Sequence, residues 1–110
     1  MFCKIIAGAL PATRVDETGT TVAFRDIAPN APVDVLVVPR AHHRDLAALT
    51  AADPRLAADL LATAVRVADK EGLADGYRVV FNAGPHAGQV VFHVHAHVLG
   101  GGELGQMATA

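Results

Sequence analysis

The spacing of apolar residues predicts one long amphipathic helix near the middle of the chain. Between Ala52 and Gly72 the apolar positions recur every three or four residues, as they do along one side of a helix, and most charged residues fall between them. Thr50 or Asp53 is a suitable N-cap. Pro54 fits the first turn, and Gly72 fits a C-terminal stop. The apolar face consists of Leu56, Leu60, Ala64 and Val67.

Shorter apolar segments predict strands. Residues 13–16 and 20–25 flank the turn sequence E-T-G and predict a hairpin. Residues 33–39, V-D-V-L-V-V-P, are apolar on both faces, which is typical of a strand covered on both sides. Two further strands are predicted at residues 77–82 and 89–99, joined by A-G-P-H-A-G.

The order of these elements predicts an α+β fold. Residues 2–7 predict a short helix, and the later connections are short enough for antiparallel pairing of the strands. We therefore expect an antiparallel sheet with helices on one side. The chain has 110 residues, of which 52 % are hydrophobic, which is enough for one domain over residues 1–110 but not for two. A glycine-rich tail begins at about residue 100.

Charge and cysteine content exclude several classes of partner. The formal net charge is −2 and the nine basic residues are scattered, so there is no basic patch for a nucleic acid. The amino-terminal residues lack the long apolar run of a signal peptide or membrane span, and the one cysteine, Cys3, excludes an internal disulfide. We expect a cytoplasmic protein that binds neither nucleic acid nor membrane.

Three of the six histidines stand at every second position near the carboxyl end of the chain. In a strand, His93, His95 and His97 would project from one face and the apolar residues between them from the other. Each imidazole has two nitrogens that need partners, so the histidine face should line a cleft or a partner surface. The spacing alone leaves three interpretations open: polar side chains on a half-exposed strand, a zinc site using His-x-His, and nucleophilic catalysis by one imidazole.

The loop at residues 82–89, N-A-G-P-H-A-G-Q, favours phosphorus as the atom attacked. Gly84 and Gly88 allow backbone N–H groups to approach the oxygens of an anion, and Asn82 and Gln89 add neutral donors. Because this loop directly precedes the histidines, it would hold a phosphate group beside them.

Residues 93–99, H-V-H-A-H-V-L, resemble the histidine triad signature that names a family of nucleotide hydrolases and transferases. Four further blocks resemble the Hint branch of this family in order and spacing: F-C-K-I-I-A-G, V-A-F-R-D-I-A-P, V-V-P-R-A-H and Y-R-V-V-F-N-A-G. The resemblance implies a homodimer with one continuous sheet and a purine nucleoside monophosphate bound to each chain. It also implies attack on the α-phosphorus without a metal or other cofactor.

The resemblance assigns unequal roles to the histidines. His95 matches the nucleophile that becomes transiently nucleotidylated. His93 and His42 match the histidines that support its orientation and tautomer, because only an unprotonated nitrogen can attack. His97 matches the histidine that faces the phosphate or the leaving group. The two remaining histidines, His43 and His86, match no triad position and are expected at the surface. Contact with substrate is the alternative for His86, which stands on the loop at residues 82–89.

Substrate-binding residues are implied in the same way. Asp26 matches the acidic residue that accepts hydrogen bonds from both ribose hydroxyls, although an Asx turn before Pro29 is the alternative from sequence alone. For Phe2 and Ile5, core packing is the alternative to a place in the base pocket. The implied base pocket consists of Phe24, Ile27, Phe2 and Ile5. The implied phosphate contacts are Asn82, Gly88 and Gln89.

The chain departs from the Hint pattern at three places. Val90 stands where that branch usually has a serine contacting the phosphate or leaving group, and loss of such a bond costs on the order of 1.5–3 kcal/mol. We therefore expect a slower reaction or another preferred leaving group. The chain has no tryptophan and so lacks the Trp-Pro-Pro-Gly ending of many relatives. Relatives that begin Cys-x-x-Cys bind structural zinc, but only the second cysteine, Cys3, is matched, so we expect no metal.

The function implied by the resemblance is hydrolysis of purine nucleoside phosphoramidates, with cleavage of the P–N bond in AMP-NH2 or AMP-lysine. Hydrolysis of dinucleoside polyphosphates is the alternative within the family. A non-catalytic nucleotide-binding module and a metal-binding protein are the alternatives outside it.

Overall fold

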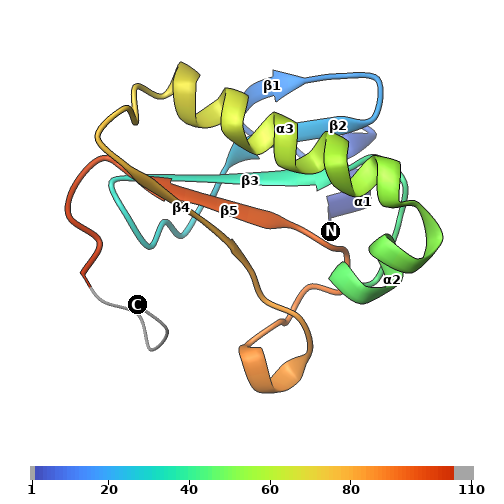
Figure 1. Cartoon of the computed structure of the whole chain (residues 1–110). Coiled ribbons are helices and arrows are strands. Elements are labelled where there is room, and N and C mark those ends of the chain that lie inside the picture. The colour runs from blue at the N-terminus through green and yellow to red at the C-terminus, as the bar shows by residue number, and fades with distance from the viewer. Residues whose placement is uncertain (1, 106–110) are drawn as a thin grey trace.

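A five-stranded antiparallel sheet forms the centre of the molecule, in a computed structural model that describes residues 2–105 (Figure 1). Its strand order is β1-β2-β3-β5-β4. The helices and strands are α1 (Phe2–Ile6), β1 (Arg14–Glu17), β2 (Thr21–Arg25), β3 (Val33–Pro39), α2 (Leu46–Ala52), α3 (Pro54–Lys70), β4 (Tyr77–Phe81) and β5 (Ala96–Gly100), with a 3₁₀ turn at Pro85–Ala87. The predicted α+β class and antiparallel pairing are confirmed.

Helix α3 is the predicted amphipathic helix, and it begins later than its pattern suggested. The Asp53 side chain accepts a hydrogen bond from the Leu56 N–H, so Asp53 is the N-cap and Pro54 is the first helical residue. The predicted apolar face is buried, and full burial of a side chain such as Leu60 contributes about 1.5–3 kcal/mol. The preceding residues form a separate helix, α2, capped by Asp45, which the pattern did not predict.

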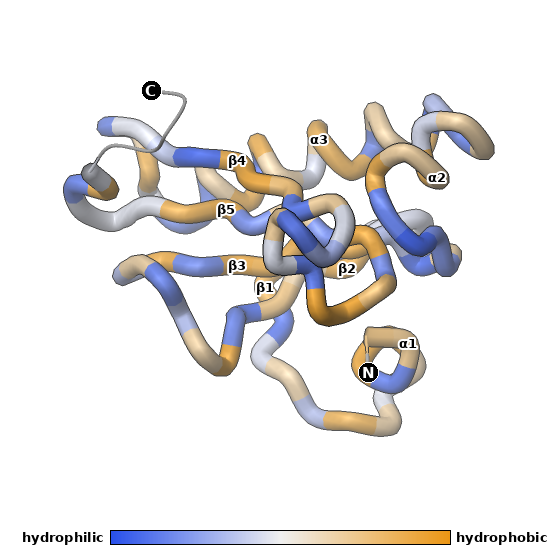
Figure 2. Tube along the Cα trace, turned by 90° about the horizontal axis from the view of Figure 1, so that it is seen from below, coloured by the Kyte–Doolittle hydropathy of each residue, from blue (hydrophilic) through white to orange (hydrophobic). Residues whose placement is uncertain are grey.

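The helices cover both faces of the sheet, so the expectation of helices on one side was wrong. Figure 2 shows α2 and α3 on one side of the strands and α1 on the other. Alternate residues of β2 and β3 enter two separate hydrophobic clusters: Ala23 and Val35 pack under α3, whereas Phe24 and Leu36 pack with α1. Because both faces of β2 and β3 are apolar, each needs its own cover.

Strand β5 is shorter than predicted. It begins at Ala96, opposite Val37 of β3 and Phe81 of β4, whereas the pattern indicated a strand over residues 89–99. Proline at position 39 has no N–H to continue the ladder, and the chain after Phe81 turns into the 3₁₀ segment. A single bond from the Val94 N–H to the His43 carbonyl, 2.8 Å, extends beyond the ladder. His93 and His95 therefore stand before the first residue of β5, outside the sheet.

None of the helices within residues 2–105 is long and apolar enough to cross a lipid bilayer.

Candidate active site

A cavity of about 450 Å³ lies on the α1 side of the sheet, next to the start of β5. His95 and His97 both line it, and its other walls come from α1, β2, the loop after β2 and the segment at residues 88–91. All eight residues predicted to bind substrate line this cavity: Phe2, Ile5, Phe24, Asp26, Ile27, Asn82, Gly88 and Gln89. A larger hollow of about 670 Å³, between residues 72–78 and 101–104, contains none of the histidines.

The hydrogen bonding of His95 leaves a lone pair on one ring nitrogen. Its Nδ1–H donates to the main-chain carbonyl of His93 at 2.8 Å, which leaves the lone pair on Nε2. Burial lowers the pKa of His95, and the neighbouring His97 lowers it further, against the opposing effects of the His93 carbonyl and the Asp26 carboxylate. The His95 ring also packs against the Phe2 ring in a T-shaped arrangement, with 5.0 Å between the ring centroids. His95 is therefore held in its neutral form with one nitrogen available.

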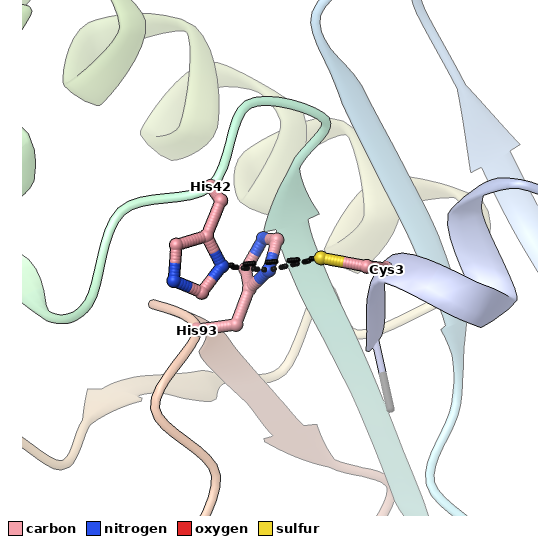
Figure 3. A group of neighbouring side chains, drawn as sticks. All are labelled: Cys3, His42 and His93. Atoms are coloured by element: carbon pink, nitrogen blue, oxygen red, sulfur yellow. Dashed lines mark hydrogen bonds between the residues drawn. The ribbon is translucent and has the colours of Figure 1, made fainter.

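His93 and His42 lie outside the cavity and contact each other and Cys3 (Figure 3). The His93 Nε2–H donates to the Pro39 carbonyl at 2.9 Å, so its Nδ1 is an acceptor, 3.2 Å from His42 Nδ1. The ring is buried, and this burial lowers the pKa of His93. His93 thus supports His95 through its main-chain carbonyl rather than through its ring, and His42 contacts the ring of His93.

His97 is paired with a carboxylate that the sequence analysis missed. Its Nδ1 lies 3.2 Å from Asp34 Oδ1 and 3.8 Å from Asp26 Oδ2, so the hydrogen bond goes to Asp34. Asp34 is 3 % exposed, and its other oxygen accepts the Asn30 N–H at 3.0 Å. The signal available in the sequence was an aspartate inside a strand that otherwise reads as buried, since buried carboxylates are rare without a partner.

Comparison with known proteins identifies the family. The HIT domain matches residues 7–104 of the chain. The chain belongs to the HIT domain family. As the resemblance implied, it is a hydrolase of that family.

The similarity to individual HIT proteins extends over almost the whole chain. Adenylylsulfatase HINT1 of Arabidopsis thaliana is 44 % identical over 108 residues, which cover 94 % of this chain and 72 % of that protein. The purine nucleoside phosphoramidase of Escherichia coli K12 is 37 % identical, covering 97 % of this chain and 91 % of that protein. A HIT family hydrolase from Clostridium thermocellum has the same fold, with a TM-score of 0.92 at 40 % identity over 97 % of this chain and 94 % of that one.

Asp26 combines the two roles that the sequence left as alternatives. Its Oδ1 accepts the Ala28 N–H at 3.0 Å, which is an Asx turn in the loop after β2. Its side chain also lines the cavity of the HIT domain. One carboxylate oxygen therefore fixes the loop, and the other, Oδ2, lies 3.8 Å from His97 Nδ1.

The side chain of Gln89 holds the loop at residues 82–89 together. Gln89 is buried, and its amide Nε2 donates to the carbonyls of Arg44 and Val91 at 2.9 and 3.1 Å. Its Oε1 accepts the Gly84 N–H at 2.8 Å. Both amide hydrogens are thus used inside the protein, and Gln89 braces the loop. Donation from Gln89 to a phosphate stays a prediction.

Gly88 and Asn82 keep places at the cavity wall. Gly88 has φ 86° in the left-handed region, which a side chain would strain, and its N–H already donates to the Pro85 carbonyl. Asn82 is half-buried and lines the cavity. Within residues 2–105, the backbone N–H groups of Val90 and Val91 make no hydrogen bond to the protein. Both residues line the cavity together with Asn82.

The three donor atoms of Cys3, His42 and His93 fit a metal site better than the sequence suggested. Zinc bonds of about 2.3 Å to sulfur and 2.0–2.1 Å to nitrogen place tetrahedral donors about 3.3–3.6 Å apart. Here the nitrogens are 3.2 Å apart, and the sulfur is 3.6 and 3.9 Å from them. A zinc ion held here would tie α1 to the loop after β3, which is a structural role. The three residues supply three of the four usual ligands.

Proposed function

We propose that this HIT hydrolase cleaves the P–N bond of purine nucleoside 5′-phosphoramidates of the AMP-NH2 or AMP-lysine type. The observation that carries the proposal is the state of His95: its Nδ1 proton is committed to the His93 carbonyl, burial lowers its pKa, and it lines a cavity with mostly apolar walls. A neutral imidazole of this kind is a nucleophile for phosphorus.

In the first step the lone pair on His95 Nε2 attacks the α-phosphorus, and a new N–P bond forms. The bond from phosphorus to the substrate amine breaks, and its electron pair leaves with the amine. The amine must gain a proton to depart as a good leaving group. His97 lines the same cavity, with ring centroids 5.3 Å from His95, and is placed to give that proton.

In the second step a water molecule attacks the phosphorus of the nucleotidyl-histidine. The N–P bond to His95 breaks, the nitrogen regains its lone pair, and AMP is released. The His97 ring, having lost a proton in the first step, accepts one from the water. The protein returns to its starting state, so the two steps balance without a metal or other cofactor.

The nucleoside would occupy the apolar part of the cavity. Phe2 and Ile5 both line the cavity and belong to the core cluster with Phe24, so packing and binding are served by the same side chains. Ile27 is 92 % exposed at the rim, where a purine base would cover it. The Oδ2 oxygen of Asp26, which lines the cavity, would accept hydrogen bonds from the two ribose hydroxyls.

The phosphate would be held by neutral donors. Val90, Val91 and Asn82 line the cavity, and their N–H groups are the neutral donors that we assign to the phosphate. Arg25 also lines the cavity, but its guanidinium is paired with Glu71. Neutral donors bind the phosphate oxygens by hydrogen bonds without cancelling their charge. They can therefore stabilise the additional negative charge that forms on these oxygens during the attack.

We also propose a cytoplasmic homodimer in which the sheets of two chains join along β4. The two sheet edges differ: β1 is short, carries a register shift between Arg14 and Asp16, and is bound by charged side chains of α3, whereas β4 pairs regularly. An irregular charged edge discourages strand addition, and a regular edge permits it. Sedimentation at micromolar concentration should give the mass of two chains, and a Val79→Pro variant should shift it toward one.

The function is tested by mixing the protein with AMP-lysine or AMP-NH2 and quenching within milliseconds. Mass spectrometry of the wild-type protein should find an added AMP on His95, and the His95→Ala variant should bind AMP without forming the adduct or releasing product. His86→Ala, an exposed histidine outside the cavity, is the matched control and should behave as wild type. An adduct that persists in His95→Ala would contradict the proposal.

A substrate panel separates the alternatives. Diadenosine triphosphate turned over faster than AMP-lysine would favour a dinucleoside polyphosphate hydrolase. AMP binding with no adduct and no turnover of any substrate would favour a non-catalytic nucleotide-binding module.

A further inference from the structure

We propose that Asp34 is a positioning residue that fixes the proton and the orientation of the His97 ring for transfer to the leaving group. This inference rests on the proposed function, in which His97 faces the leaving group. It starts from the 3.2 Å contact between His97 Nδ1 and Asp34 Oδ1.

The carboxylate of Asp34 is buried and has few possible hydrogen-bond partners. Its side chain has no exposed surface. Its Oδ2 accepts a hydrogen bond from the Asn30 N–H, and its Oδ1 accepts one from the His97 ring. A buried carboxylate accepts hydrogen bonds and cannot donate one while ionised, so the shared proton must sit on His97 Nδ1. The loop bond to Asn30 fixes one oxygen and thereby aims the other.

This arrangement prepares Nε2 of His97 for acid catalysis. With both nitrogens protonated, the ring donates Nδ1–H to Asp34 and presents Nε2–H to the cavity. After Nε2 gives its proton to the departing amine, the ring is left in the Nδ1–H tautomer that Asp34 already holds. The proton can therefore be given away and taken back without a rotation of the ring.

The two cavity histidines are thereby held by different acceptors. His95 donates Nδ1–H to a neutral carbonyl, and His97 donates Nδ1–H to a carboxylate. Asp26 does not share this work, because its 3.8 Å separation from His97 Nδ1 is too long for a hydrogen bond. With valine at position 90, no hydroxyl at that position can relay a proton, so the pair Asp34–His97 carries the transfer.

Asp34→Asn tests the inference with little change of shape. The oxygen of the new Asn side chain can keep the hydrogen bond to the Asn30 N–H, and its NH2 group then faces His97 Nδ1. An NH2 group can only donate, so Nδ1 must accept, and the proton of the neutral His97 ring moves to Nε2. The proton on a neutral ring cannot be released to an amine. We expect kcat with AMP-lysine to fall about 10²–10⁴-fold, with KM changed less than about threefold.

Adenylyl sulfate provides the discriminating substrate, because sulfate leaves as a stable anion and needs no proton. The comparison is made on the first step, as the rate of nucleotidyl-His95 formation in a single turnover, because hydrolysis of that intermediate is common to both substrates. In Asp34→Asn this rate should fall less than about tenfold with adenylyl sulfate and about 10²–10⁴-fold with AMP-lysine. Equal losses on both substrates would show that Asp34 only supports the fold and would overturn the inference. The double variant Asp34→Asn, His97→Ala should be no slower than His97→Ala alone, since residues acting through one another are not additive. Asp75→Asn, exposed and far from the cavity, is the matched control.

A second measurement does not depend on activity. Nitrogen-15 NMR of the wild-type protein should show His97 protonated at Nδ1, and Asp34→Asn should move the proton to Nε2. A wild-type His97 with an unprotonated Nδ1 overturns the inference even if the variant fails to fold. If the wild type shows the Nδ1–H form but forms no adduct with AMP-lysine, the proposed function fails and the role of Asp34 in fixing the tautomer stands.

Discussion

Two groups of histidines lie a few ångströms apart and use their nitrogens differently. In the cluster of Cys3, His42 and His93, the His93 ring donates to the Pro39 carbonyl through Nε2, and its Nδ1 contacts the other two side chains. At the cavity, His95 and His97 each use Nδ1 for a hydrogen bond within the protein, so that Nε2 is the nitrogen left for substrate. Burial lowers the pKa of both His93 and His95. The difference between them is access to the cavity, so a low pKa alone does not mark the nucleophile.

The largest expected effect is a difference in kcat between a variant of the cavity histidine His95 and a variant of His93. His95→Ala should lower kcat with AMP-lysine by about 10³-fold or more because it removes the attacking nitrogen. His93→Ala should lower kcat by only about tenfold, because the carbonyl that orients His95 belongs to the main chain and remains. Stopped-flow release of AMP measures both. A His93→Ala loss as large as that of His95→Ala would remove the distinction.

The next effect concerns stability. His93→Ala removes a buried ring and its bond to the Pro39 carbonyl, so the free energy of unfolding should fall by about 2–4 kcal/mol. His42→Ala removes an exposed ring and should cost less than about 1 kcal/mol. Urea unfolding at pH 7.5 measures both variants, and equal costs would show that the two rings are not held differently.

Lowering the pH should destabilise the native protein through the buried ring of His93 and the half-buried ring of His95. The pKa values of His93 and His95 lie below the unfolded value of 6.5, so the unfolded chain takes up protons first as the pH falls. Their contribution to stability is complete above about pH 6.5 and is lost as the pH falls through the folded pKa values. Urea midpoints between pH 7.5 and 5 measure this slope. His93→Asn should reduce it, and an unchanged slope would contradict the assignment.

The smallest expected effect is that of a chelator. The donors of Cys3, His42 and His93 lie outside the cavity, and the proposed steps use imidazole nitrogens and water. Incubation with EDTA should therefore change kcat by less than about twofold, whether or not a structural zinc ion is removed. Metal analysis before and after incubation reports the zinc content. A tenfold loss of kcat that added zinc reverses would show that the cluster of Cys3, His42 and His93 takes part in the reaction.

Local patterns predicted the parts of the molecule that depend on neighbours in sequence. The helix containing Leu56 and Leu60 follows its apolar spacing, and the residues between the triad histidines, such as Val94 and Ala96, pack under that helix as alternation requires. The eight substrate residues implied by the family resemblance line one cavity. Their roles in binding remain predictions.

Features that depend on distant partners were not predicted. The start of β5 is set by where β3 and β4 end, and the pattern of residues 89–99 contains no sign of this. Gln89 reads as a free amide in sequence, but the carbonyl of Arg44 accepts one of its hydrogens. Asp34 reads as an interruption of an apolar strand, and its partner His97 lies 63 residues away. A single sequence carries no signal for such pairings.

The position of Phe2 has a practical consequence for protein production. Its ring lies 5.0 Å from that of His95, 6.0 Å from His93 and 5.6 Å from Phe24, so α1 brings the second residue of the chain beside both histidine groups. Any purification tag fused ahead of Phe2 would therefore begin at the wall of the cavity. Kinetic constants are best measured on protein without residues added at that end.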